Sequence, residues 1–199
     1  EGQRPPPMAA AAWQFDGVVI SGSQTSVYDD YDWIHEATEW VRRVHRAGIP
    51  VLGICWGHQL LAQALGGRVV DMGTHELGYE QIVRLGADPL FEGIPATFTS
   101  FETHTDRVAE LPSDAVALAR NEYGIQAFRL DHTYGVQFHP EYDRETAVWV
   151  TESKDLPDDR RRSVLDGITD ESVEAARQST QLFDNFRRLV ETRRPVQQP

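Results

Sequence analysis

The feature that most constrains the fold is a short apolar run that leads without a linker into a glycine-flanked turn. Residues 49–54, Ile-Pro-Val-Leu-Gly-Ile, have the continuous apolar character of a strand buried on both faces. Cys55 follows directly, and a helix is predicted over residues 58–65, closed by Gly66 and Gly67. A buried strand that turns straight into a helix indicates a parallel sheet covered by helices.

The neighbouring segments extend this pattern. Residues 17–21 form a second apolar run that ends at Gly22, and residues 30–47 carry apolar side chains three and four positions apart, which is typical of an amphipathic helix. Because the later strands lack intervening helices, we expect an α/β sheet that is parallel at its centre and antiparallel towards one edge. The remaining predicted elements are strands at 79–85, 115–120, 125–130 and 134–139 and a C-terminal helix at about 170–191.

The length of 199 residues fits one domain with a single core. Residues 1–12 are rich in proline and alanine and are predicted to be a tail or linker, which leaves residues 13–199 for the domain. No apolar run approaches the roughly 20 residues needed to cross a bilayer, and the first residues do not have the pattern of a signal peptide. We therefore expect a soluble, cytoplasmic protein that does not contact a membrane.

The formal net charge is −12, and Lys154 is the only lysine among 19 basic residues. An acidic surface with so little lysine is typical of halophilic organisms, and arginine-biased, GC-rich genomes produce part of the same pattern, so both explanations stay open. A net acidic chain without a basic stripe repels phosphate backbones. Nucleic-acid binding is therefore not expected.

Cys55 is the only cysteine, so it forms no internal disulfide. Gly53 and Gly57 flank it with the spacing of a nucleophile elbow, in which a sharp strand-to-helix turn presents a reactive side chain. At a helix N-terminus the dipole favours the thiolate. The alternative is a small buried hydrophobic residue, but the flanking glycines and the strand-turn-helix context favour a nucleophile.

A second motif supplies a base for this thiol. His139 ends a predicted strand, and Glu141 follows two positions later, where an extended chain places it on the same side as the imidazole. The proline between them restricts the backbone. We predict that His139 exchanges a proton with Cys55 while Glu141 orients the ring. The alternative is a histidine at a strand end beside a surface glutamate.

Together these motifs resemble the class I glutamine amidotransferases. The resemblance rests on Gly-Ile-Cys-Trp-Gly-His-Gln at 53–59 and Gly-Val-Gln-Phe-His-Pro-Glu at 135–141, and it covers roughly residues 15–143. It implies a three-layer, flavodoxin-like fold and hydrolysis of the glutamine side-chain amide through a γ-glutamyl thioester on Cys55. The pattern is most similar to stand-alone members that resemble the glutaminase part of GMP synthase.

The resemblance also implies further site residues. Backbone N–H groups of Ser23 and Trp56 should form the oxyanion hole, which is worth about 3 kcal/mol per donor. By position, Gly22, Gln59, Thr105 and Asp106 should bind the substrate, the last two from a loop that resembles the family's Ser-His-Gly-Asp loop. The family often has Gly-Gly-Pro where this chain has Gly22-Ser23-Gln24, so we expect this loop to differ in geometry from that of the family.

The family also opens with a strand and a helix ahead of the strand predicted at 17–21. Neither is found before that strand in this sequence, so we expect an N-terminal truncation that removes a central strand of the sheet. The sheet should then expose apolar surface.

Three functions fit the motifs. The first is a glutaminase that supplies ammonia to a synthase subunit, with glutamine as its substrate. The second is a hydrolase of γ-glutamyl peptides or conjugates, which would use the same chemistry with another leaving group. The third is a regulatory domain without turnover, which retention of all three triad residues disfavours. We expect no cofactor and no metal, because the seven histidines form no paired ligand motif.

Overall fold

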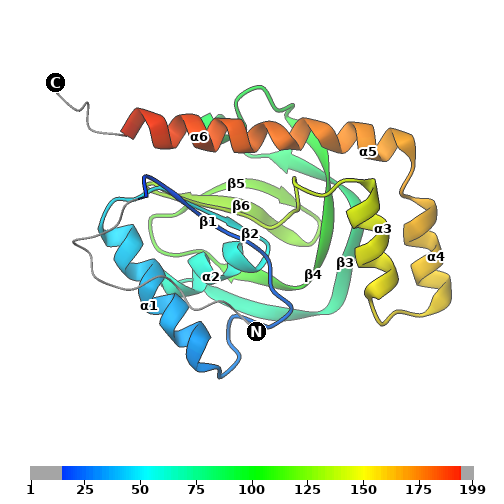
Figure 1. Ribbon diagram of the computed structural model, residues 1–199, viewed down its shortest axis with the longest axis horizontal. Coiled ribbons are helices and arrows are strands. Elements are labelled where there is room, and N and C mark those ends of the chain that lie inside the picture. Colours follow the sequence, from blue (N-terminus) through cyan, green and yellow to red (C-terminus); the bar gives the residue numbers. More distant parts are fainter. Residues whose placement is uncertain (1–14, 194–199) are drawn as a thin grey trace.

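The computed structural model describes residues 15–193, and these form one seven-stranded sheet with helices on both faces (Figure 1). The predicted tail at residues 1–12 lies outside the described residues. The strands are β1 (Val18–Ile20), β2 (Val51–Ile54), β3 (Arg68–Arg84), β4 (Thr97–Glu110), β5 (Val116–Asn121), β6 (Gly124–Leu130) and β7 (Thr133–Val136). The α-helices are α1 (Asp32–Arg46), α2 (Trp56–Ala64), α3 (Arg144–Ser153), α4 (Asp158–Asp166), α5 (Asp170–Ala176) and α6 (Gln181–Arg193). Two short 3-10 helices, η2 (Pro89–Phe91) and η3 (Arg177–Thr180), complete the described elements.

The sheet combines parallel and antiparallel pairing in the order β1-β2-β7-β6-β5-β3-β4. Strands β1, β2 and β7 are parallel, and each remaining neighbouring pair is antiparallel. This confirms the expected mixed sheet: α1 connects the parallel strands β1 and β2, whereas short turns or loops connect the antiparallel strands from β3 to β7. Strand β1 has one neighbour among the described strands, and its Val19 is 55% exposed.

Alternate side chains of β2 pack into two separate apolar cores, one on each face of the sheet. Val51 of β2 packs with α1 and α2 on one face of the sheet, whereas Leu52 and Ile54 pack on the other face with Leu182 and Phe186 of α6. Figure 1 shows α1 and α2 together on one side and α6 running along the other. The result is the three-layer arrangement that the sequence predicts.

The junction of β2 and α2 is held by contacts that leave no room for side chains. A Cβ atom added at Gly57 would lie 2.3 Å from the carbonyl oxygen of Ile20, and one added at Gly53 would lie 2.5 Å from the carbonyl oxygen of Gly57. These are backbone contacts between β1, β2 and the first turn of α2. The two glycines therefore permit the sharp turn at Cys55.

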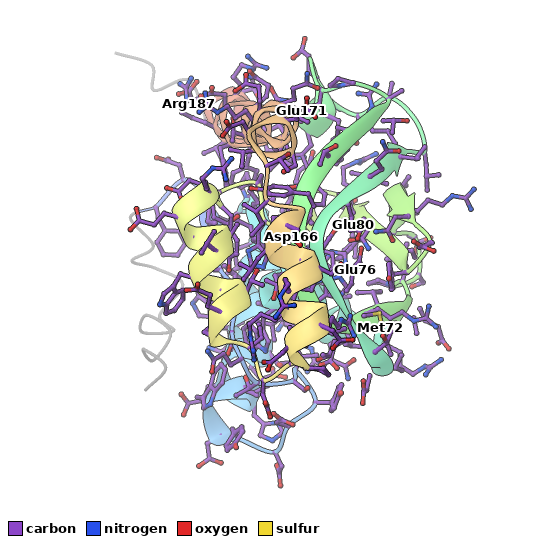
Figure 2. The ribbon with its side chains drawn as sticks, turned by 90° about the vertical axis from the view of Figure 1, so that its right-hand side faces the viewer. Met72, Glu76, Glu80, Asp166, Glu171 and Arg187 are labelled. Atoms are coloured by element: carbon purple, nitrogen blue, oxygen red, sulfur yellow. The ribbon has the colours of Figure 1, made fainter. Side chains whose placement is uncertain are left out.

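A third apolar cluster lies where β3 and β4 meet the helices after residue 143. Leu77 and Phe101 of these strands pack with Ala147 and Val150 of α3 and with Ile168. Figure 2 shows α3 and α4 next to each other, with Met72, Glu76 and Glu80 following β3 beside α4. This cluster fixes α3 close to the carboxyl end of β7.

Three parts of this fold differ from the sequence-based expectations. The segment expected as a loop around Thr105 and Asp106 lies inside β4, which pairs with β3 over most of its length. Helices α3 and α4 were not predicted. The single helix expected at about 170–191 is instead α5, η3 and α6 in succession. Among residues 15–193, no helix is both long and apolar enough to span a membrane.

Gly57→Ala should destabilise the protein although residue 57 lies in a helix. Alanine normally stabilises a helix by about 1 kcal/mol relative to glycine, but here its methyl group meets the backbone of Ile20, which cannot yield as a flexible side chain does. We expect the free energy of unfolding to fall by about 1 to 3 kcal/mol. Urea denaturation measures this. Gly86→Ala is the matched control, because nothing lies within 4 Å of its added Cβ. Equal stability of the two variants would contradict the clash.

Candidate active site

Cys55 occupies the turn between β2 and α2. It is the N-cap residue of α2 and adopts φ 53° and ψ −106°, a conformation that L-residues rarely adopt. Its backbone N–H donates to the carbonyl of Val136 on β7 at 2.8 Å, and its carbonyl accepts from the N–H of Gln59 at 3.1 Å. The side chain is buried, with 7% exposure. The backbone is therefore fixed on both sides of a strained residue, as expected for a nucleophile elbow.

His139 lies beyond the end of β7, which stops at Val136, three residues earlier than the strand that the sequence predicts. Its backbone N–H donates to the carbonyl of Phe101 at 2.8 Å. Its ring Nδ1 lies 2.8 Å from Oε1 of Glu141, and the aromatic ring of Tyr142 stacks on the imidazole at a centroid distance of 4.1 Å. Because a carboxylate only accepts, Nδ1 carries the proton and Nε2 is free for the thiol.

The thiol and the imidazole interact electrostatically. Burial alone would raise the pKa of Cys55, but its interaction with the imidazole of His139 outweighs burial, and the pKa is lowered. Burial likewise opposes the charge of His139, yet Cys55 and Glu141 raise the pKa of that imidazole to about 10. Among the described residues Nε2 of His139 has no partner of ordinary hydrogen-bond geometry. Both pKa shifts favour a thiolate beside an imidazolium.

Two adjoining cavities of about 410 and 330 Å³ meet at Cys55. The smaller contains His139 and Glu141, and the larger contains Gln59, Thr105 and Asp106. A cavity of about 1160 Å³ lies between α3 and α5 and includes His139 and Glu141 but not Cys55. Cavity size therefore does not identify the candidate active site, whereas the position of the Cys55 thiol does.

The predicted oxyanion-hole residues lie beside the thiol. Ser23 and Trp56 both line the larger cavity with Cys55. Trp56 is the first residue of α2, where a backbone N–H has no acceptor within the helix. A Cβ added at Gly22 would lie 3.5 Å from Cε1 of His139, so this loop follows the imidazole closely without clashing with it.

Gln59 is more constrained than the sequence suggests. Its side-chain amide donates to the carbonyl of Asp106 at 3.0 Å and to Oε1 of Gln137 at 3.1 Å, and the residue is 3% exposed. Both N–H donors of the amide are thus used within the protein, which leaves its oxygen for a ligand. The side chain of Asp106 accepts from the hydroxyl of Tyr28 at 2.9 Å.

Behind these residues lies a fully buried charged cluster. Nε2 of His104 is 2.9 Å from Oε2 of Glu76 and 3.2 Å from Oε2 of Glu102, while Nδ1 donates to the carbonyl of Asp106 at 2.8 Å. Burial opposes charging of His104, but the two carboxylates raise its pKa to about 10. Burial also raises the pKa of Glu102 to about 7, although His104 works against it.

Among the described residues, Glu76, Glu102 and His104 are the one group whose ligand atoms lie near enough together to hold a metal ion. Nε2 of His104 lies 2.9 Å from Oε2 of Glu76, which is the distance of an ion pair when the imidazole is protonated, although Nε2 has no partner of hydrogen-bond geometry among the described residues. Amide groups of Asn121 and Gln126 also donate to Glu76. Glu76 is thus held by these two amides and by the ion pair with His104.

The structure brings every predicted site residue to the two cavities and adds several that sequence reasoning missed. The additions are Tyr28, Glu76, Glu102, His104, Tyr142 and Lys154. Tyr142 follows Glu141 directly, so its proximity was available as a signal. Glu102 and His104 precede Thr105 in the segment that resembles the family's loop, so a second signal was available. No local pattern marks Tyr28, Glu76 or Lys154.

Comparison with known proteins agrees with this geometry. Residues 4–148 match the family model described as glutamine amidotransferase class-I. A GMP synthase (glutamine-hydrolyzing) of Thermomicrobium roseum is 40% identical over 126 residues, which is 63% of this chain and 23% of that protein. The chain thus matches about a quarter of the length of such relatives.

Two solved structures share the fold. A glutamine amidotransferase from Methylobacillus flagellatus has a TM-score of 0.77 and 24% identity, over 92% of this chain and 80% of that one. A glutamine amidotransferase from Thermotoga maritima has a TM-score of 0.73 and 24% identity, over 87% of this chain and 78% of that one.

The thiolate of Cys55 should depend on His139. In the wild type we expect alkylation by iodoacetamide to have its midpoint below pH 9.0, the ordinary value for the thiol, because the imidazolium stabilises the thiolate. In His139→Gln that charge is lost while burial remains, so the midpoint should move upwards. The alkylation rate measured between about pH 5 and 10 gives both midpoints. An unchanged midpoint in the variant would show that the two side chains do not interact.

Glu102→Gln should change how stability depends on pH. The carboxyl of Glu102 has a pKa of about 7 in the folded protein, above the ordinary value of 4.5, so between these pH values the folded state binds the extra proton. The contribution of this group to the free energy of unfolding therefore falls as pH rises through that range. Glutamine does not titrate, so the stability of the variant minus that of the wild type should increase from pH 4.5 to about 7.

Urea denaturation at several pH values measures this difference. Glu122→Gln is the control, because it removes the same charge from an exposed turn. A difference between Glu102→Gln and the wild type that stays constant over this pH range would refute the raised pKa.

Proposed function

Because this chain belongs to the class I glutamine amidotransferase family, we propose that it hydrolyses the side-chain amide of glutamine through a thioester on Cys55 and supplies ammonia to a synthase. The observation that supports this most directly is the contact series Cys55, His139 and Glu141 beside two cavities. Sulfur, imidazole and carboxylate follow one another in the order that covalent amide hydrolysis requires.

The first half of the proposed reaction forms the thioester. The thiolate of Cys55 attacks the amide carbon of glutamine, and the carbonyl oxygen becomes an oxyanion that the N–H groups of Ser23 and Trp56 stabilise. The imidazolium of His139 then gives its proton from Nε2 to the amide nitrogen. The carbon–nitrogen bond breaks, ammonia leaves, and the glutamyl group stays on sulfur.

The second half regenerates the thiol. Neutral His139 takes a proton from water, and the hydroxide equivalent attacks the thioester carbon. The carbon–sulfur bond breaks, glutamate leaves, and the imidazole and thiolate return to their initial charges. Glu141 holds Nδ1–H throughout, so Nε2 always faces the reacting atoms. Gln59, Thr105 and Asp106 are proposed to hold the substrate's α-carbon end.

The synthase partner that would consume the ammonia is also part of the proposal. The relatives named GMP synthase (glutamine-hydrolyzing) combine two activities in their name, and this chain matches about a quarter of their length. We extend only the glutamine-hydrolysing part to this chain. The ammonia it releases would be consumed by a synthase, so the acceptor chemistry belongs to that partner.

Cys55→Ala and His139→Ala should each lower the rate of glutamate release from glutamine by about 10³-fold or more, because either change removes a group that forms or breaks a bond. His35→Ala is the matched control, because His35 is exposed on α1 and lines neither cavity at Cys55. Circular dichroism should show that all three variants keep their fold. Unchanged turnover in a folded Cys55→Ala protein would overturn the proposed chemistry.

The same assay tests whether the protein prefers ammonia or an amino acid as the leaving group. Wild-type protein should hydrolyse glutamine with a higher kcat/KM than γ-glutamyl dipeptides. The opposite preference would reassign the chain to hydrolysis of γ-glutamyl conjugates.

A further inference from the structure

Lys154 lies at the cysteine site, although it follows the part of the chain that matches the family model. It lines both cavities that meet at Cys55. It is the only lysine of the chain, and among the described residues no other lysine or arginine lines either cavity. Besides His104 and His139, which are paired with carboxylates, Lys154 is thus the cation of the two cavities among the described residues.

The backbone of Lys154 is fixed in this position. Lys154 is the C-cap residue of α3, and its carbonyl accepts a hydrogen bond from Nη2 of Arg161 at 3.1 Å. The same guanidinium nitrogen donates to the carbonyl of Leu156 at 3.0 Å, which holds the turn after α3. Val150 and Ala147 anchor α3 in the third apolar cluster. The location of Lys154 is thus a consequence of packing.

The ammonium group has no carboxylate partner. Within the described residues no acidic oxygen lies within 4.0 Å of it, whereas many arginines of this acidic chain form ion pairs. The charge of Lys154 acts on His75, which also lines the larger cavity. The pKa of His75 is lowered to about 4, first by burial and then by the charges of Lys154 and Arg160. An unpaired cation beside a cavity is available for an anionic ligand.

The charges around the larger cavity match the α-carbon end of an amino acid. Asp106 is buried there, with its carbonyl fixed by Gln59 and His104. Asp155 lines the same cavity, so carboxylates are available for an ammonium group. A free amino acid carries a carboxylate as well, and Lys154 is the cation in reach. These charges suit the zwitterion of a free amino acid, and a peptide-bonded glutamine lacks the α-carboxylate that Lys154 would bind.

We propose that Lys154 binds the α-carboxylate of the substrate and so restricts this site to free amino acids with a γ-amide. The inference rests on the proposed glutamine hydrolysis and deepens it, because it names the substrate group that is recognised. Glutamine within a protein chain has no α-carboxylate and would be rejected. Lys154 thus determines specificity and takes no part in bond breaking.

The test compares two substrates in Lys154→Met, Lys154→Arg and wild-type protein. L-Glutamine has the α-carboxylate, and 4-aminobutanamide is the same molecule without it. Lys154→Met should lower kcat/KM for glutamine by about 10- to 100-fold, mainly through KM, and leave 4-aminobutanamide unchanged. Lys154→Arg should restore most of the loss. Arg162→Met, which removes an exposed cation that lines neither cavity, should change nothing.

Two results would overturn the proposal: glutamine kinetics unchanged in Lys154→Met, or an equal loss with both substrates. A second measurement distinguishes failure of the inference about Lys154 from failure of the proposed glutamine hydrolysis. If the wild type turns over neither substrate, alkylation of Cys55 is measured with a diazoketone analogue of glutamine and with iodoacetamide, which has no α-carboxylate. Lys154→Met should slow only the analogue. An equal ratio of the two rates in wild type and variant would refute the role of Lys154.

Discussion

The site depends on how closely three backbone segments approach one another. Because positions 53 and 57 have no side chains, the first turn of α2 lies against the carbonyl of Ile20 on β1 and turns directly from β2. Cys55, between these glycines, adopts a positive φ at the helix N-terminus. The loop after β1, the thiol and the imidazole of His139 are neighbours at this junction, together with the proposed oxyanion donors.

Two sets of charged groups act on the pKa of Cys55, one next to the thiol and one deeper in the sheet. Next to the thiol is the imidazole of His139, whose charge stabilises a thiolate that burial would otherwise suppress. Deeper in β3 and β4, His104 stands between Glu76 and Glu102, and both His104 and Glu102 also act on Cys55, with opposite signs. The register of β3 and β4 places Glu76 opposite His104, so strand pairing sets part of the field at the nucleophile.

Local sequence patterns predicted those parts of the molecule that depend only on residues close together in the sequence. The elbow at Cys55 and the neighbours His139 and Glu141 needed only adjacent residues, and the strand-helix alternation indicated the mixed sheet. Strand β4 was missed because its buried stretch contains Glu102 and His104, which suggest a loop until their partner on β3 is known. Helix α4 has no buried residue, so no apolar period revealed it. The contact of Tyr28 with Asp106 joins residues far apart in sequence.

The arrangement around His139 also bears on the activation entropy of the proposed glutamine hydrolysis. The backbone of this residue is tied to β4, its ring is covered by Tyr142, and Nδ1 is held by Glu141. An imidazole on a free loop would have to be immobilised each time a proton is transferred. Here rotation about its side-chain bonds is already lost when the polypeptide folds, so the barrier to reaction contains little of that cost.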